Sequence, residues 1–413
     1  MKNTLALGLF LFSNIAYTAP ESFQINGQTA TFVDFKKVVH EISVNPGGHF
    51  TKVRSTIELS QPKRGNILFD FRAGADTVYL NGARMKSEKI ETPRGEINLN
   101  MLDQETSPGE HTLVINSALG FSFGGKRDIY FKMRDLYGWF LDRRLPTNLE
   151  YDQHQVVIKL KLNLRDASKY RPMTNALTSE WDEAQRTWVL TFPEYFTSSS
   201  LFFHLIHVDK YNFLETSYKS NTGRNIPIRI YGPKDVALSD YDLRAQEAMN
   251  EMESNYGEYP HPELVIYARG GRGGMEFSGA TETSLGSLGH EIFHTYFGRG
   301  VMPSDGNSGF IDEGLASWRD YGYQRSEKPN FSSSKVAGRS QYEKGTHKHS
   351  YKKGRSFFAY VDYKLASQGG LKAFLRIYYK KNVYKTVTIE GFLKELNEWS
   401  GMDFTSDFNQ YLR

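Results

Sequence analysis

The 413-residue chain contains no cysteine. Disulfide bonds, thiolate metal sites and a cysteine nucleophile are therefore excluded, and any metal ion must be held by histidine nitrogens and carboxylate oxygens. Long apolar runs are absent after the first twenty residues, so we expect no membrane-spanning segment in the mature chain. No basic block stands out either, and the formal net charge is only +4, a balance that does not favour nucleic-acid binding.

A short apolar stretch opens the chain. Lys2 precedes an apolar run at residues 5–12, and small residues follow up to Ala19. This order predicts a bacterial-type signal peptide over residues 1–19, because the run is too short to span a bilayer. An uncleaved apolar start is the alternative. Export without cysteine favours a periplasmic or secreted bacterial protein, since exported eukaryotic proteins usually carry disulfides.

Residues 20–210 have the pattern of a β domain. Short runs of apolar and β-branched residues, such as residues 55–59 and 155–162, are separated by turn residues. Strands at this spacing predict a β-sandwich or a saddle-shaped sheet. His204 and His207 are three apart in one strand-like run, which places them on opposite faces, so we expect them to be structural.

Residues 211–413 have a mixed pattern, which predicts an α/β domain that becomes helical from about residue 310. The whole chain is therefore predicted to be an α+β protein with more than one domain. Leu243 is expected on the apolar face of the first helix. The polar, basic residues 324–349 are the best candidate for a mobile loop. The expected elements are a strand at residues 225–231, helices at about 240–256, 283–298 and 312–323, and further helices after residue 350.

An H-E-x-x-H pattern begins at His290 in the second of these helices. His290 and His294 are four residues apart, so both imidazoles lie on one helix face and can reach the same ion. Glu313 follows after eighteen residues and is the expected third ligand. Three protein ligands leave one zinc position open, as a catalytic site requires. Glu291 is placed to take a proton from water and pass it to a leaving amine.

A surface helix with two solvated histidines is the competing interpretation of this pattern. The helix is apolar around the motif, at Leu288, Ile292, Phe293 and Phe297, which favours a partly buried histidine face. The chain also has no cysteine that could offer a better metal site. We therefore expect one zinc ion per chain.

Two further residues could act beside the metal. Glu276 follows Gly273 and Gly274, which permit close approach of a bound chain, and its carboxylate could hold the free ammonium group of a peptide. An edge-strand glutamate facing solvent is the alternative. Tyr351 opens a later helix, where its phenol could donate to an oxyanion or could simply pack as an aromatic residue at a helix start.

These residues together resemble the aminopeptidase N family of gluzincin metallopeptidases. The likeness is specific over residues 255–354. The turn YGEYPHP at residues 256–262 is similar to F-G-x-Y-P-Y-P, and GGMEF at residues 273–277 is similar to G-x-M-E-N. The H-E-x-x-H-x18-E spacing is the same as in the family, and YKKG at residues 351–354 is similar to Y-x-K-G.

The resemblance implies a thermolysin-like catalytic domain that removes N-terminal residues from peptides. It implies zinc ligation by His290, His294 and Glu313, with Glu291 as general base and then acid. Oxyanion stabilisation is assigned to Tyr351, and anchoring of the substrate is assigned to Glu276 with Gly273, Gly274 and Met275.

The chain also departs from the family pattern. Phe277 replaces the usual asparagine, which weakens the exopeptidase assignment, and Tyr342 is a second candidate for the tyrosine motif. The large helical C-terminal domain of many members has no counterpart, so we expect a more open cleft. The alternatives are a zinc endopeptidase on oligopeptides, a glycyl-aminopeptidase-like enzyme, and an exported partner-binding protein with a retired peptidase fold.

Overall fold

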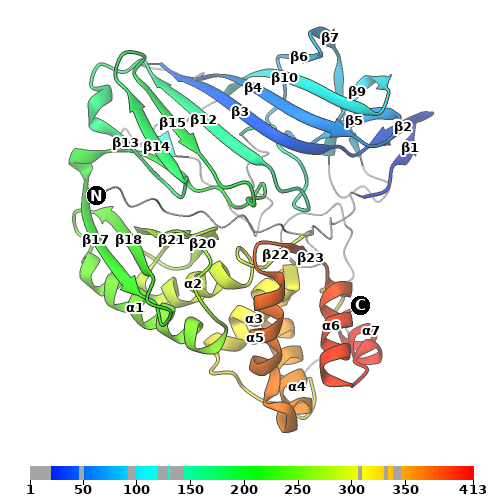
Figure 1. The fold of residues 1–413 in the computed structure, drawn as a ribbon, viewed down its shortest axis with the longest axis vertical. Coiled ribbons are helices and arrows are strands. Elements are labelled where there is room, and N and C mark those ends of the chain that lie inside the picture. The colour runs from blue at the N-terminus through cyan, green and yellow to red at the C-terminus, as the bar shows by residue number, and fades with distance from the viewer. Residues whose placement is uncertain are drawn as a thin grey trace, which may run out of the picture.

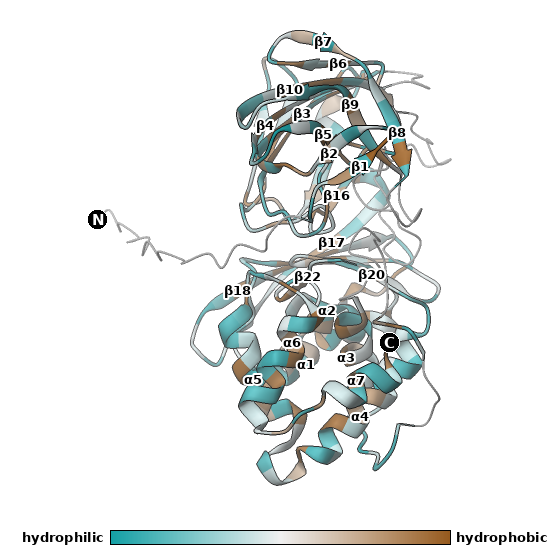
Figure 2. Ribbon diagram, turned by 90° about the vertical axis from the view of Figure 1, so that its right-hand side faces the viewer, coloured by the Kyte–Doolittle hydropathy of each residue, from teal (hydrophilic) through white to brown (hydrophobic). Residues whose placement is uncertain are grey.

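The computed structural model describes residues 20–45, 51–91, 98–119, 129–130, 144–305, 309–329, 334–337 and 346–413. The predicted signal peptide and Tyr342 lie outside these residues. Among the helices that are described, none is both long enough and apolar enough to cross a bilayer. Figures 1 and 2 show a strand-rich part and a helix-rich part stacked along the long axis of the molecule.

Two β-sheets pack face to face in the strand-rich part. Apolar residues of both sheets, including Ile57 and Leu113 from the larger and Ile67 and Phe69 from the smaller, form one buried core. The larger sheet has the order β14-β15-β12-β3-β4-β10-β6-β7 and the smaller has the order β1-β2-β5-β9-β8. Their bounds are β1 (Phe23–Ile25), β2 (Gln28–Thr31), β3 (Asp34–Val44), β4 (Thr51–Gln61), β5 (Gly65–Phe69), β6 (Thr77–Leu80), β7 (Ala83–Met85), β8 (Ser87–Glu91), β9 (Asn98–Thr106), β10 (Gly109–Leu119), β12 (Gln155–Leu162), β14 (Thr178–Asp182) and β15 (Thr187–Thr191).

A small third sheet connects this sandwich to the rest of the chain. Its order is β11-β16-β13, with β11 (Ile129–Tyr130), β13 (Tyr170–Thr174) and β16 (Phe203–His207). A second apolar core runs from Leu160 on β12 through Leu205 on β16 to Val265 and Phe277 in the next sheet. Because apolar packing continues across this region, the division of the chain near residue 210 stays a prediction.

The fourth sheet supports two helices, one of which carries the H-E-x-x-H motif. Its order is β17-β18-β19-β21-β20, so β20 is an edge strand. Helices α1 and α2 lie together beneath the sheet in Figure 1, and their apolar residues Met249 and Ile292 share a core with Ile228 and Ile266 of the sheet. The bounds are β17 (Tyr211–Lys219), β18 (Asn225–Pro233), β19 (Leu264–Ala268), β20 (Gly274–Phe277), β21 (Ala280–Thr283), α1 (Leu238–Asn255) and α2 (Leu288–Tyr296).

Two predictions for these helices were wrong. Helix α2 begins at Leu288 and not near Thr283. Thr283 is the last residue of β21, which pairs with both β19 and β20, and Leu285–Ser287 form a 3-10 turn between the strand and the helix. Leu243 is 64% exposed, whereas Leu238 and Tyr241 of α1 are buried. The periodicity identified the helix, but its apolar face is turned away from Leu243.

The remaining helices form the end of the described chain. Phe357, Phe358, Val361 and Leu365 are all buried, which confirms the predicted apolar face. Helix α3 begins at Gly309, slightly before the predicted start, and ends at Asp320. The elements are β22 (Met302–Pro303), α3 (Gly309–Asp320), a π-helical turn (Ser350–Gly354), α4 (Arg355–Lys364), α5 (Gly370–Asn382), β23 (Thr386–Val387), α6 (Ile389–Ser400) and α7 (Thr405–Tyr411).

Part of the segment 324–349 is held in place and does not behave as a mobile loop. Val336 and Ala337 are buried in the helical core. The backbone N–H of Ser334 donates to the Tyr411 carbonyl at 3.2 Å, and that of Ala337 donates to the Leu412 carbonyl at 2.9 Å. This stretch therefore packs against the end of α7.

Candidate active site

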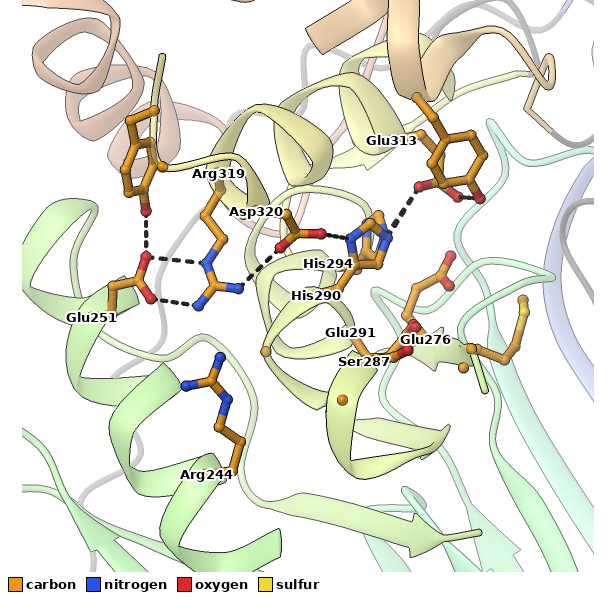
Figure 3. A pocket seen from close by; sticks show the side chains of 18 residues that line it. Arg244, Glu251, Glu276, Ser287, His290, Glu291, His294, Glu313, Arg319 and Asp320 are labelled. Atoms are coloured by element: carbon orange, nitrogen blue, oxygen red, sulfur yellow. Dashed lines mark hydrogen bonds and ion pairs between the residues drawn. The ribbon is translucent and has the colours of Figure 1, made fainter. Parts of the chain in front are cut away.

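The three predicted metal ligands meet at one point. His290 and His294 project from the same face of α2, one turn apart, and Glu313 reaches them from α3 (Figure 3). The Nε2 atoms of the two histidines are 2.9 Å apart, and the Oε2 atom of Glu313 lies 3.3 Å and 3.5 Å from them. Two imidazole nitrogens and one carboxylate oxygen at such spacing are a donor set that suits zinc.

Carboxylates on α3 orient both histidines. Asp320 lies 2.6 Å from the Nδ1 atom of His290, and Asp312 is hydrogen-bonded to the Nδ1 atom of His294. When Nδ1 donates its proton to a carboxylate, the lone pair of Nε2 faces the other way. In both histidines the Nε2 lone pair is directed toward Glu313, so Nε2 is the nitrogen available to bind a metal ion.

The charges around the site favour a cation. Burial and the neighbouring His294 lower the pKa of His290, but hydrogen bonds to Asp320 and Glu313 outweigh them and raise it to about 10. Burial opposes the same change in His294, yet nearby carboxylates, first among them Asp312, raise its pKa well above the usual range. Burial would raise the pKa of Glu313, but the two histidines lower it well below its usual value. A divalent cation bound by these three side chains would take the place of the protons.

The carboxylate of Glu291 lies beside the ligands and is buried. Burial raises the pKa of Glu291 to about 8, and the nearby Glu276 contributes to the rise. A carboxyl group tuned toward neutral pH is suited to accept and return a proton. Glu291, Glu276 and His294 each have one ligand atom within 4.8 Å of the others.

Gly274 makes room for Glu291. A Cβ atom added at Gly274 would lie 2.5 Å from the Cδ atom of Glu291 and 2.7 Å from its Cγ atom. The sequence suggested that glycines at 273 and 274 admit a bound peptide. In the structure, the missing side chain of Gly274 leaves space for the Glu291 carboxylate to lie against the edge strand. Gly273 has a left-handed backbone (φ +73°), which disfavours a side chain there.

Glu276 is buried on the edge strand, so the solvent-facing alternative was wrong. Its Oε1 atom accepts a hydrogen bond from Arg299 at 2.8 Å. Arg299 also donates to Ser199 at 2.7 Å, and Ser199 donates to the carboxylate of Glu150 at 2.7 Å. A buried polar chain therefore holds Glu276 from behind, while its carboxylate lines the cavity that contains the ligands.

Phe277 points away from the site. Strand residues alternate between the two faces of a sheet, so Phe277 lies opposite to Glu276. Its ring is buried in the second apolar core and packs against Phe202, with 5.1 Å between ring centroids. Met275 belongs to the same core but also lines the cavity. The side chain of Phe277, which stands where G-x-M-E-N has asparagine, therefore contributes to the apolar core behind β20 and not to the cavity.

Tyr351 reaches the ligand cluster from the π-helical turn. Its hydroxyl donates a hydrogen bond to Oε1 of Glu313, and its ring is nearly parallel to that of His290. Two glycines allow this approach, since a Cβ atom on Gly354 would lie 2.9 Å from the Cα atom of Gly314. The backbones of α3 and the π-helical turn thus touch directly, which brings the phenol to the site.

One cavity of about 700 Å³ is lined by the three predicted ligands together with Glu291, Glu276, Asp320 and Tyr351. In Figure 3, Glu276 and Glu291 lie to one side of the histidines, and Arg244, Arg319 and Glu251 lie to the other. No sequence motif pointed to the residues of this second side, nor to Arg299, Asp312 and Asp320. Asp320 alone carried a usable signal, because it lies seven residues after Glu313, two turns along the same helix.

Comparison with known proteins finds a match only at the level of structure. No protein-family profile and no curated protein matches the chain. An M1 zinc metallopeptidase from Deinococcus radiodurans superposes with a TM-score of 0.63 at 14% identity, over 89% of this chain and 91% of that chain. A mutant M1 zinc metallopeptidase from the same organism gives 0.63 at 15% identity, over 90% and 92%. The same mutant bound to a Tyr-Ser-Ala substrate gives 0.63 at 14% identity, over 90% and 92%. The chain therefore has the mixed α/β fold of the M1 zinc metallopeptidases.

Proposed function

We propose that this protein is a zinc-dependent aminopeptidase that removes N-terminal residues from peptides. The observation that carries the proposal is the meeting of His290, His294 and Glu313 beside the buried Glu291 in one cavity. A site that only stabilised the fold would not need a free carboxylate next to an open coordination position. The peptide-bound complex of a structural neighbour supports the substrate class.

The roles of the side chains follow from their places. Zinc held by His290, His294 and Glu313 would supply Lewis acidity for the substrate carbonyl and the attacking water. Glu291 takes a proton from that water and transfers it to the leaving amine. The Tyr351 hydroxyl, which donates to Glu313 in the structure, would donate instead to the substrate oxygen that becomes negatively charged.

Glu276 gives the proposal its exopeptidase character. Its carboxylate lies within 4.8 Å of a Glu291 carboxylate oxygen and of a His294 nitrogen. The first amine of a peptide is separated from the carbonyl carbon of the first peptide bond by only one carbon atom, so an ammonium group at Glu276 keeps that bond close to both residues. An ammonium group bound there would place the first peptide bond at the metal. Arg299 and the polar residues behind it keep the carboxylate in this position.

A zinc endopeptidase is the second candidate, and one observation favours it. Arg299 already neutralises part of the charge of Glu276, because the two form a buried ion pair at 2.8 Å. A carboxylate paired in this way attracts a free ammonium group less strongly than an unpaired one. An aminopeptidase therefore requires a free N-terminal amine on its substrate, whereas an endopeptidase does not.

A substrate panel separates the candidates. Free aminoacyl anilides, a free peptide and its N-acetyl form are each assayed with and without a chelator. The aminopeptidase predicts chelator-sensitive cleavage of free substrates only, and equal cleavage of the acetylated peptide would establish the endopeptidase. Glu291→Gln should abolish hydrolysis while metal analysis still finds one zinc ion per chain. Unchanged turnover in that variant would refute the assigned base, and a wild-type protein without bound zinc would favour the partner-binding alternative.

Export to the periplasm or medium is proposed on the sequence pattern alone, since residues 1–19 are outside the described part of the chain. N-terminal sequencing of the protein recovered from fractionated bacterial cells tests it. A cytoplasmic protein that retains Lys2 would contradict the proposal.

A further inference from the structure

The cavity has a cationic end opposite to Glu276. Arg244 reaches it from α1 and Arg319 from α3, and in Figure 3 their guanidinium groups point toward one another on the far side of His290. Gly289, the residue directly before His290, is where they meet. A Cβ atom at Gly289 would lie 2.8 Å from Nη1 and 3.1 Å from Nη2 of Arg319, and 3.4 Å from Nη2 of Arg244. Two guanidinium groups thus surround one point beside a metal ligand.

The two arginines differ in how their charges are balanced. Arg319 is nearly buried, and its Nε atom donates to Glu251 at 3.1 Å while its Nη1 atom donates to Asp320 at 3.1 Å. Tyr323 donates to the same Glu251 carboxylate. This network fixes the guanidinium group and uses its charge.

Arg244 has a weaker partner. Its ion pair with Glu247, at 3.1 Å, is one helical turn away on the surface of α1, and the two side chains are 44% and 55% exposed. Exposed pairs of this kind contribute little to stability, so Arg244 can exchange Glu247 for another anion at little cost. An anion in the cavity would also relieve the repulsion between two neighbouring guanidinium groups.

The opposite ends of the cavity match the two ends of a short peptide. Glu276 offers a carboxylate on one side of the metal ligands, and Arg244 offers a guanidinium group on the other. We propose that Arg244, beside the fixed Arg319, binds a substrate carboxylate close to the scissile bond. The preferred substrates are then di- and tripeptides with a free C-terminal carboxylate, or peptides with an acidic side chain just after the cleaved bond. This inference rests on the proposed aminopeptidase function and narrows its substrate class.

Binding to the zinc-loaded Glu291→Gln variant tests the inference without relying on turnover. Ala-Ala, Leu-Ala and Tyr-Ala are titrated calorimetrically as free acids and as C-terminal amides, and Leu-Glu-amide is compared with Leu-Gln-amide. We expect the carboxylate-bearing member of at least one pair to bind about tenfold more tightly, since charge-assisted hydrogen bonds to a guanidinium group are strong. If the dipeptide acids bind more tightly than their amides, the C-terminus supplies the carboxylate that Arg244 binds. If Leu-Glu-amide binds more tightly than Leu-Gln-amide, an acidic side chain supplies it.

Substitutions assign the preference to Arg244. Adding Arg244→Gln should reduce the acid-to-amide ratio to about one, whereas Arg244→Lys should keep part of it. Arg171→Gln, which removes a similarly exposed arginine from β13 outside the cavity, should leave the ratio unchanged. Equal binding of acids and amides, no binding of any peptide, or a ratio that survives Arg244→Gln would overturn the inference. Hydrolysis of the same peptides by the unsubstituted enzyme tests the proposed function separately. Cleavage of acids and amides at equal rates would support the proposed peptidase activity and contradict only the role of Arg244.

Discussion

Replacing Gly274 by alanine should disable the proposed general base while leaving the fold and the metal site intact. The added Cβ atom would lie 2.5 Å from Cδ of Glu291, and ordinary contacts begin near 3.4 Å. The Glu291 carboxyl group must therefore move by roughly 1 Å, and a displacement of that size in a catalytic group can reduce the rate by about 100-fold. The backbone of Gly274 is not left-handed, so alanine adds no conformational strain.

The assay compares kcat/KM on the best free aminoacyl substrate, zinc content and the thermal unfolding midpoint. We expect a loss of about 100-fold in kcat/KM, one zinc ion per chain and a midpoint within a few degrees of the parent protein. Gly270→Ala is the matched control, because a Cβ atom at Gly270 in the same glycine-rich loop meets nothing within 4 Å. It should retain full activity.

Two results would refute this reasoning. Activity of Gly274→Ala within about threefold of the parent would mean that the close approach to Glu291 has no catalytic role. Loss of zinc together with activity would mean that the substitution disturbs the ligands, although Glu291 is not one of them.

Three further predictions concern the site and the buried core. Asp320→Asn should weaken zinc binding by about 10- to 100-fold, as measured by chelator competition, because it removes the carboxylate that orients His290; unchanged affinity would contradict this role. Gly354→Ala should lower the thermal midpoint and the activity together, because its Cβ atom would press on the Gly314 backbone, which cannot move aside as a side chain can; a variant as stable and active as the parent would show that the two backbones do not need to touch. Burial lowers the pKa of His204 from its usual 6.5 to about 3. As pH falls below 6.5, His204 therefore gains a proton in the unfolded chain before it does so in the folded protein. The free energy of unfolding that is present above pH 6.5 is lost progressively toward pH 3. The loss between pH 7 and pH 5 in chemical denaturation should be smaller in His204→Asn by about 2 kcal/mol, and an equal loss in both proteins would contradict the shift.

Local periodicity predicted the elements better than their ends. The turn of α2 that carries His290 and His294 follows from a spacing of four, and the buried face of α4 follows from its aromatic and aliphatic residues. The start of α2 was predicted five residues early because threonines and glycine before it are compatible with several conformations. Pairing with β19 and β20 keeps Thr283 in β21, and Leu285–Ser287 then form a 3-10 turn before α2. Sheet pairing is a long-range interaction, and a window of neighbouring residues does not contain it.

The expected set of metal ligands follows from the sequence alone. The chain has no cysteine, and two histidines one helical turn apart with a glutamate on the next helix predict a metal site built from imidazole and carboxylate groups. The residues that tune and surround those ligands were decided only by the tertiary structure. Arg299 meets Ser199 across one hundred positions of the chain, and Arg319 meets Glu251 across sixty-eight. Helical spacing fixes which side chains share a face, but only the packing of sheet against helix and of helix against helix decides which distant charge lies opposite that face.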